Sequence, residues 1–177
     1  SKFMKPLNNW SIKIWKNKKN RKPLIIQGAR QVGKTWIMKE FGNTHFEQTV
    51  YINFESSERL QKVFLDDFSI SRIISIFEIE SGVSIDSKNT LIILDEIQEA
   101  DKGLTALKYF YENAPEYYII AAGSLLGVSL QKNSSFPVGK VDFLMLYPLS
   151  FEEFLINLGQ ETLLKTLKNK KWNIIEP

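Results

Sequence analysis

Gly28, Gly33, Lys34 and Thr35 have the types and the spacing of a loop that wraps around nucleotide phosphates. The glycines allow close approach of the backbone to a phosphate, Lys34 can neutralise phosphate charge, and Thr35 can coordinate Mg²⁺. A lysine in the first turn of a helix opposes the helix dipole unless an anion is bound there. We therefore predict a phosphate-binding loop instead of a plain strand-to-helix turn. The nucleotide-binding segment is completed by Ala29, Arg30, Gln31, Val32 and Trp36.

Asp95 and Glu96 directly follow the apolar run Leu91 to Leu94. An apolar strand of a parallel sheet delivers such residues to its carboxyl end, where ligands bind. There Asp95 can hold Mg²⁺ through water, and Glu96 can polarise a water molecule for attack on a γ-phosphate. An acidic pair that only caps the next helix is the alternative. The presence of the glycine loop earlier in the chain favours the catalytic interpretation.

Several further positions have a functional and an ordinary interpretation. Ser124, at the end of an apolar strand, could orient the attacking water, or it could cap the following segment. Gln98 could contact water or nucleotide, or lie on the surface. Lys140 is a weak substitute for an arginine finger, because none of the four arginines lies in the C-terminal half. These arginines are Arg21, Arg30, Arg59 and Arg72, and the single histidine, His45, fits an ordinary exposed side chain.

Strands and helices alternate along the chain, and most strands are apolar on both faces, which predicts a parallel sheet covered by helices on both sides. A mostly parallel sheet of five strands is expected, in a three-layer α-β-α arrangement. The predicted strands span residues 23–28, 50–55, 90–96, 117–124 and 141–146. The predicted helices begin at Pro6 and span 34–42, 58–65, 69–80 and 103–111, and a C-terminal helix opens with a capping box at Ser150 and Glu153.

The composition is that of an ordinary globular domain: 177 residues, 44% apolar and 24% charged. With no cysteine and one histidine, a disulfide framework and a thiolate or histidine-rich metal site are excluded. No apolar run approaches bilayer length, so neither a membrane nor a secretion route is expected, and a cytoplasmic location is the default. The net charge is +3. Basic groups at 13–22 and 165–171 fit solvated faces or a nucleic-acid contact.

The segments "KPLIIQGARQVGKTW", "VYINFE", "TLIILDEIQEA" and "SFPVGKVDFLMLYPLSFEEFL" occur in order along the chain. With them the sequence resembles a group of prokaryotic AAA-type ATPases that carry a C-terminal domain of unknown function. The resemblance implies an AAA-like P-loop fold with ATP as the nucleotide and Mg²⁺ as its metal. It also implies that Gly28 to Thr35 form the Walker A motif, that Asp95 and Glu96 form Walker B, and that Ser124 is a sensor.

The chain is expected to be one domain, with a covering helix in 1–20, a P-loop core in 21–149, and a helical segment in 150–177 that leads to an absent downstream domain. The leading hypothesis is an ATPase that drives conformational change in an attached domain or partner. The lack of a recognisable arginine finger and second sensor suggests low activity and leaves a slow switch or a DNA-associated scaffold as the alternative. A phosphotransferase is disfavoured because no acceptor pocket is recognisable. An oligomer is compatible with the sequence.

Overall fold

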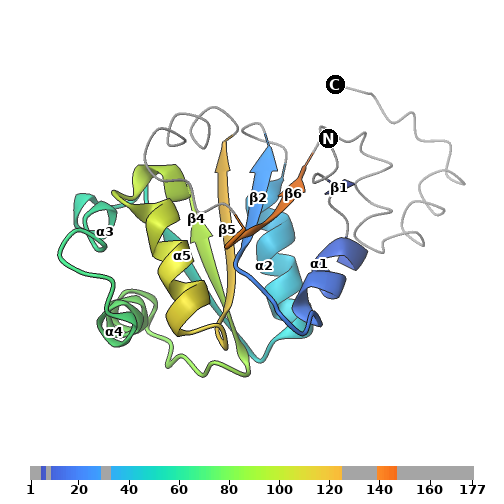
Figure 1. Ribbon diagram of the computed structural model, residues 1–177, viewed down its shortest axis with the longest axis horizontal. Coiled ribbons are helices and arrows are strands. Elements are labelled where there is room, and N and C mark those ends of the chain that lie inside the picture. The colour runs from blue at the N-terminus through green and yellow to red at the C-terminus, as the bar shows by residue number, and fades with distance from the viewer. Residues whose placement is uncertain (1–4, 7–8, 29–32, 125–138, 147–177) are drawn as a thin grey trace, which may run out of the picture.

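The core of the molecule is a six-stranded parallel sheet in the order β1-β6-β2-β5-β4-β3 (Figure 1). The computed structural model describes residues 5–6, 9–28, 33–124 and 139–146. The strands are β1 (Lys5–Pro6), β2 (Leu24–Gly28), β3 (Gln48–Asn53), β4 (Thr90–Asp95), β5 (Tyr118–Ser124) and β6 (Asp142–Met145). The helices are α1 (Asn9–Lys16), α2 (Lys34–His45), α3 (Glu58–Gln61), α4 (Ile70–Ser81), α5 (Gly103–Asn113) and the short 3-10 helix η1 (Ile97–Glu99).

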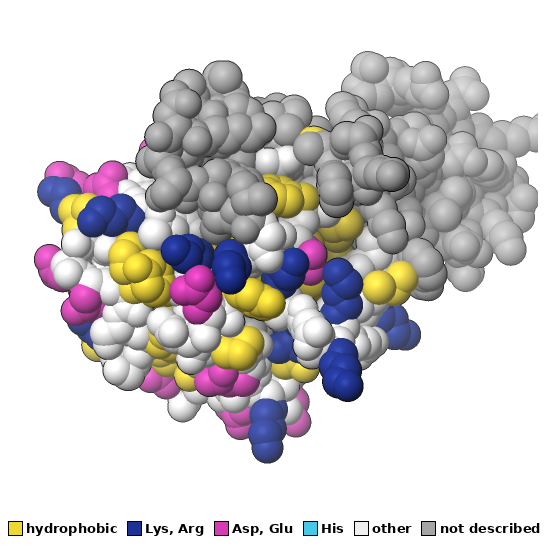
Figure 2. Space-filling view, in the orientation of Figure 1, with side chains coloured by type: hydrophobic (Ala, Val, Ile, Leu, Met, Phe, Trp, Pro, Cys, Tyr) yellow, Lys and Arg dark blue, Asp and Glu magenta, His cyan; other side chains and the backbone are white. Residues whose placement is uncertain are grey.

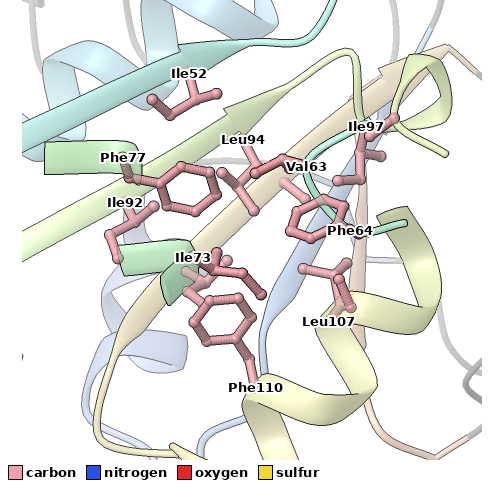
Figure 3. Close-up of a cluster of buried hydrophobic side chains, with 14 of the residues drawn as sticks. Ile52, Val63, Phe64, Ile73, Phe77, Ile92, Leu94, Ile97, Leu107 and Phe110 are labelled. Atoms are coloured by element: carbon pink, nitrogen blue, oxygen red, sulfur yellow. The ribbon is translucent and has the colours of Figure 1, made fainter. Parts of the chain in front are cut away.

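Helices cover both faces of the sheet, and each face has its own apolar cluster. On one face α1 and α2 pack against the sheet through Ile12, Trp15, Ile37, Met38 and Phe41. On the other face α3, α4, α5 and η1 enclose a larger cluster, shown in Figure 3, that includes Phe64, Ile73, Phe77, Ile97 and Phe110. This three-layer architecture confirms the predicted fold class. The two-residue β1 is an edge strand added to the five strands that were expected.

Strand β4 shows why the apolar runs fold in this way. Leu91 and Ile93 belong to the cluster beneath α1 and α2, whereas Ile92 and Leu94 belong to the cluster beneath α4 and α5. Successive side chains of a strand point to opposite faces, so a strand covered on both sides must be apolar at every position. All six residues of β4 are buried. The strand thereby fixes the position of its last residue, Asp95, firmly in the sheet.

Some predicted helix boundaries were wrong. The first helix begins at Asn9, and Pro6 lies in β1 instead. Helix α2 continues past Gly42 to His45, so Gly42 does not end the helix. A glycine is needed at this position because of packing. A Cβ at Gly42 would overlap the side chain of Thr49 in β3. The helix expected at 58–65 ends at Gln61, whereas α4 ends as predicted near Gly82, which adopts a φ of +70°.

The strand order places the predicted site across three neighbouring strands. β5 lies between β2 and β4, so the loop strand and the acidic strand are not direct neighbours. Because the sheet is parallel, the carboxyl ends of all three strands meet at one edge, where open α/β sheets bind ligands. Among the described residues, no helix is both long enough and apolar enough to cross a bilayer. The C-terminal helix expected from Ser150 lies outside the described residues.

Candidate functional site

The glycine loop connects the end of β2 with the start of α2. Gly33, the residue before α2, has a φ of +85°, a left-handed conformation that glycine adopts without strain. Lys34 begins the helix and is buried, with 7% of its surface exposed, and its Nζ donates to the carbonyl oxygen of Gly28 at 2.8 Å. A buried ammonium group favours a compensating anion. The N–H groups of the first helical turn favour an anion at the same place.

Asp95 lies close to Thr35, as the two predicted motifs require. The Thr35 Oγ1 donates to Asp95 Oδ2 at 2.7 Å, although the residues are sixty positions apart in the chain. Asp95 is 4% exposed and accepts two further hydrogen bonds, from the Glu96 backbone N–H to Oδ1 at 2.9 Å and from the Tyr51 hydroxyl to Oδ2 at 2.6 Å. The carboxylate is therefore buried, and both of its oxygens are held by donors.

The donor set at this position fits Mg²⁺. This ion is usually held by one or two carboxylates together with waters and substrate phosphates, and it does not need a cage of protein ligands. Thr35 supplies a hydroxyl oxygen, and Asp95 supplies a carboxylate beside it. The described residues contain no group of three or more His, Cys, Asp or Glu side chains that could hold a metal. A shared site for metal and phosphate is thus the arrangement these residues fit.

Glu96 follows the end of β4 in an uncommon backbone conformation. Its φ of 53° and ψ of 49° lie in the left-handed region, which costs energy for a residue with a side chain. Gln98 donates from Nε2 to Glu96 Oε2, so Gln98 contacts the predicted water-polarising group directly. Residues held in such conformations are concentrated at functional sites. The surrounding structure therefore fixes Glu96 just beyond the buried Asp95.

The other predicted nucleotide-binding positions are distributed around the same edge. Ser124 is the last residue of β5 and pairs in register with Gly28 of β2, so it lies beside the loop. Trp36 is in the first turn of α2 and is 45% exposed. The predicted loop positions Ala29, Arg30, Gln31 and Val32 lie outside the described residues.

The remaining candidate cations pair with groups outside the predicted site. Lys140 precedes β6 at the amino edge of the sheet, where its Nζ is 3.6 Å from Glu112 Oε1. Arg59 pairs with Glu80, and Arg72 pairs with Asp67. Arg21 donates to the backbone carbonyls of Lys16, Pro115 and Glu116. None of these three arginines, which are those in the described part of the chain, pairs with Asp95 or Glu96.

Tyr51 is a site residue that the sequence analysis missed. It lies on β3, opposite Ile93 of β4, and its hydroxyl reaches diagonally to Asp95. Burial, followed by the hydrogen bond to Asp95, raises the pKa of Tyr51 well above its usual range. The hydroxyl therefore remains protonated near neutral pH and serves as a donor. The one signal in the sequence is the alternation along β3. It places Tyr51 on the opposite face of the sheet from its neighbours Val50 and Ile52.

Comparison with known proteins identifies a family and one related sequence. A family model described as "AAA domain" matches residues 20–155. An uncharacterized protein of Methanocaldococcus jannaschii, MJ1544, is 30% identical over 134 residues. That match covers 74% of this chain and 27% of the relative, so the chain spans about a quarter of the length of this protein.

Two solved structures are similar to this chain at low sequence identity. The Orc1 protein of Aeropyrum pernix, solved in complex with DNA, is 12% identical, with a TM-score of 0.48 over 92% of this chain and 53% of its own. The Pif1 helicase of Candida albicans is 15% identical, with a TM-score of 0.43 over 94% of this chain and 44% of its own.

Proposed function

Because the chain belongs to the AAA domain family, and is therefore a nucleotide-binding, ATPase-like P-loop module, we propose that it binds ATP together with Mg²⁺ and hydrolyses the ATP. One observation carries this proposal. The 2.7 Å hydrogen bond between Thr35 and Asp95 joins the loop motif to the acidic motif at one edge of the sheet. Neither the loop motif nor the acidic motif, taken alone, requires that the two lie close together. A metal-assisted phosphate site requires both motifs and their proximity.

Each residue of the site has a distinct part in the proposed reaction. Lys34 binds the β- and γ-phosphates, and the helix start beside it favours their negative charge. Thr35 and Asp95 would hold Mg²⁺, which supplies neutralisation of charge on the phosphate oxygens when it is bound. Glu96 orients and polarises the attacking water, and Ser124, at the end of the intervening strand, helps to place that water.

We further propose that turnover drives a conformational change in an attached domain or partner. The match to the relative from Methanocaldococcus jannaschii covers 27% of that protein, so in this relative the core is joined to further chain. A cation in the role of an arginine finger would complete the site during hydrolysis. This cation would come from outside the described residues or from a partner. We therefore expect the isolated chain to hydrolyse ATP slowly.

The proposed function predicts that nucleotide binding depends on the metal. Calorimetric titration with ATP in Mg²⁺ buffer should give clearly tighter binding than the same titration with EDTA. Loss of an ion that contacts both Asp95 and the phosphates removes several favourable charge interactions, and we expect a decrease in affinity of about tenfold or more. Phosphate release should stop in EDTA. If the chain does not bind ATP under either condition, the proposed function is wrong.

A nucleic-acid-associated switch is the second candidate function, and the charge distribution favours it. No Asp or Glu occurs before Glu40, whereas Lys and Arg are frequent in that part of the chain. Figure 2 shows Lys and Arg side chains across the visible face, with Asp and Glu side chains among them. An open pocket lies at the amino edge of the sheet, opposite the Asp95 site, and is lined by residues that include Lys19, Arg21, Tyr111 and Glu116.

Binding of DNA through this surface would depend on salt. We expect the affinity for a short duplex to fall with salt concentration, with a slope in log K of about −0.9 for each phosphate that is neutralised. The variant Lys19→Ala should reduce the magnitude of that slope by about 0.9, the share of one phosphate contact. Lys62→Ala, which removes an exposed lysine of the α3 region, is the matched control. Fluorescence anisotropy measures both slopes, and the absence of binding at low ionic strength would exclude the DNA function.

A further inference from the structure

The hydroxyl of Tyr51 is the only side-chain donor besides Thr35 that the described residues give to Asp95. A carboxylate has about four lone-pair positions for hydrogen bonds or metal contacts. Thr35 and Tyr51 occupy the two positions on Oδ2, and the Glu96 N–H occupies one position on Oδ1. Within the described part of the chain, no donor takes the fourth position, which lies on Oδ1.

We propose that Tyr51 is a positioning residue that orients the Asp95 carboxylate for Mg²⁺. This inference rests on the proposed function and adds a residue to the metal site. By holding Oδ2, the Tyr51 hydroxyl would keep the carboxylate in one orientation, in which Oδ1 could accept a hydrogen bond from a water held by the ion. The Thr35 hydroxyl can continue to donate to Oδ2 while its own oxygen is available as a ligand.

The surroundings of Tyr51 hold its ring in place without using the hydroxyl. The ring packs against the cluster beneath α1 and α2, and the Lys39 Nζ lies 3.9 Å from its centroid, in a cation–π contact. The hydroxyl is therefore delivered to Asp95 by a ring that is fixed independently. A phenylalanine at this position would keep the packing and the contact with Lys39, and would lose only the hydroxyl, with its hydrogen bond to Asp95 and its interaction with Thr35.

The test compares ATP affinity with and without Mg²⁺ in wild type and in Tyr51→Phe. Partners that orient metal ligands typically contribute about 10- to 100-fold to metal affinity. We therefore expect the ratio of the Kd in EDTA to the Kd in Mg²⁺ to fall about tenfold in Tyr51→Phe, with the Kd in EDTA unchanged. Tyr109→Phe is the matched control, since Tyr109 stacks on Phe68 in the other layer of the protein, and its ratio should equal that of wild type.

The possible results separate this inference from the proposed function. A wild-type ratio in Tyr51→Phe would overturn the positioning role and leave the ATP and Mg²⁺ proposal intact. An equal loss of affinity in Mg²⁺ and in EDTA would also overturn it, because a purely structural defect acts on both titrations. If wild type itself shows no difference between Mg²⁺ and EDTA, both proposals fail. Thermal unfolding without ligand checks that the two variants are folded.

Discussion

Replacing Lys34 with alanine is expected to weaken ATP binding by about 10- to 100-fold. Hydrogen bonds that involve a charged group contribute about 1.5–3 kcal/mol, and each 1.4 kcal/mol corresponds to a tenfold change in affinity. Lys34 is buried at the start of α2 and its Nζ reaches back to Gly28, so the ammonium lies beside the end of β2. Calorimetric titration of the variant with ATP and Mg²⁺ measures the loss.

The control for this experiment is Lys62→Ala, which also removes one positive charge but from an exposed side chain. Its ATP affinity should match that of wild type. Thermal unfolding in the absence of ATP separates loss of the ligand contact from loss of the fold, because Lys34→Ala also removes the hydrogen bond to Gly28. Equal ATP binding by folded Lys34→Ala and wild type would contradict the assignment of the loop as a phosphate site.

Replacing Glu96 with glutamine should lower the rate of ATP hydrolysis by about 10²- to 10⁴-fold, the usual contribution of a general base. The amide cannot accept a proton, but it retains the size of the side chain and an oxygen that can accept from Gln98. ATP affinity should therefore persist. Single-turnover phosphate release and calorimetry, measured on the same preparation, report the two properties separately.

Glu99→Gln is the appropriate control for the catalytic variant. Glu99 lies three residues further along in η1, is exposed, and loses the same charge on substitution. We expect its hydrolysis rate to equal that of wild type. If Glu96→Gln hydrolyses ATP as rapidly as Glu99→Gln, Glu96 does not polarise the attacking water, and another group must take that role.

The parts of the site that could be predicted from the sequence are those encoded by short contiguous segments. Gly33, Lys34 and Thr35 are adjacent in the chain, and Asp95 follows a short apolar run whose length predicts a buried strand. Once both segments belong to one parallel sheet, the carboxyl ends of their strands lie at the same edge, because all the strands run in the same direction. The contact between Thr35 and Asp95 is the geometric result.

Tyr51 could not be assigned in this way, because its contact depends on the register between β3 and β4. That register pairs Tyr51 with Ile93 and brings its hydroxyl within 2.6 Å of Asp95. A shift of one residue would send the ring to the opposite face of the sheet. The sequence contains no local signal for register between strands so distant in the chain. Gly42 illustrates a similar ambiguity, since a glycine needed for contact with Thr49 resembles a helix stop.

The position of β2 in the sheet has a consequence for when the candidate nucleotide site forms during synthesis. Both neighbours of β2, namely β5 and β6, come from the later part of the described chain, and the pairing ends at Met145. A nascent chain that has emerged only as far as β4 therefore contains the loop and the acidic pair but has no partner on either side of the loop strand. We therefore expect nucleotide binding to begin only after β5 and β6 have emerged from the ribosome.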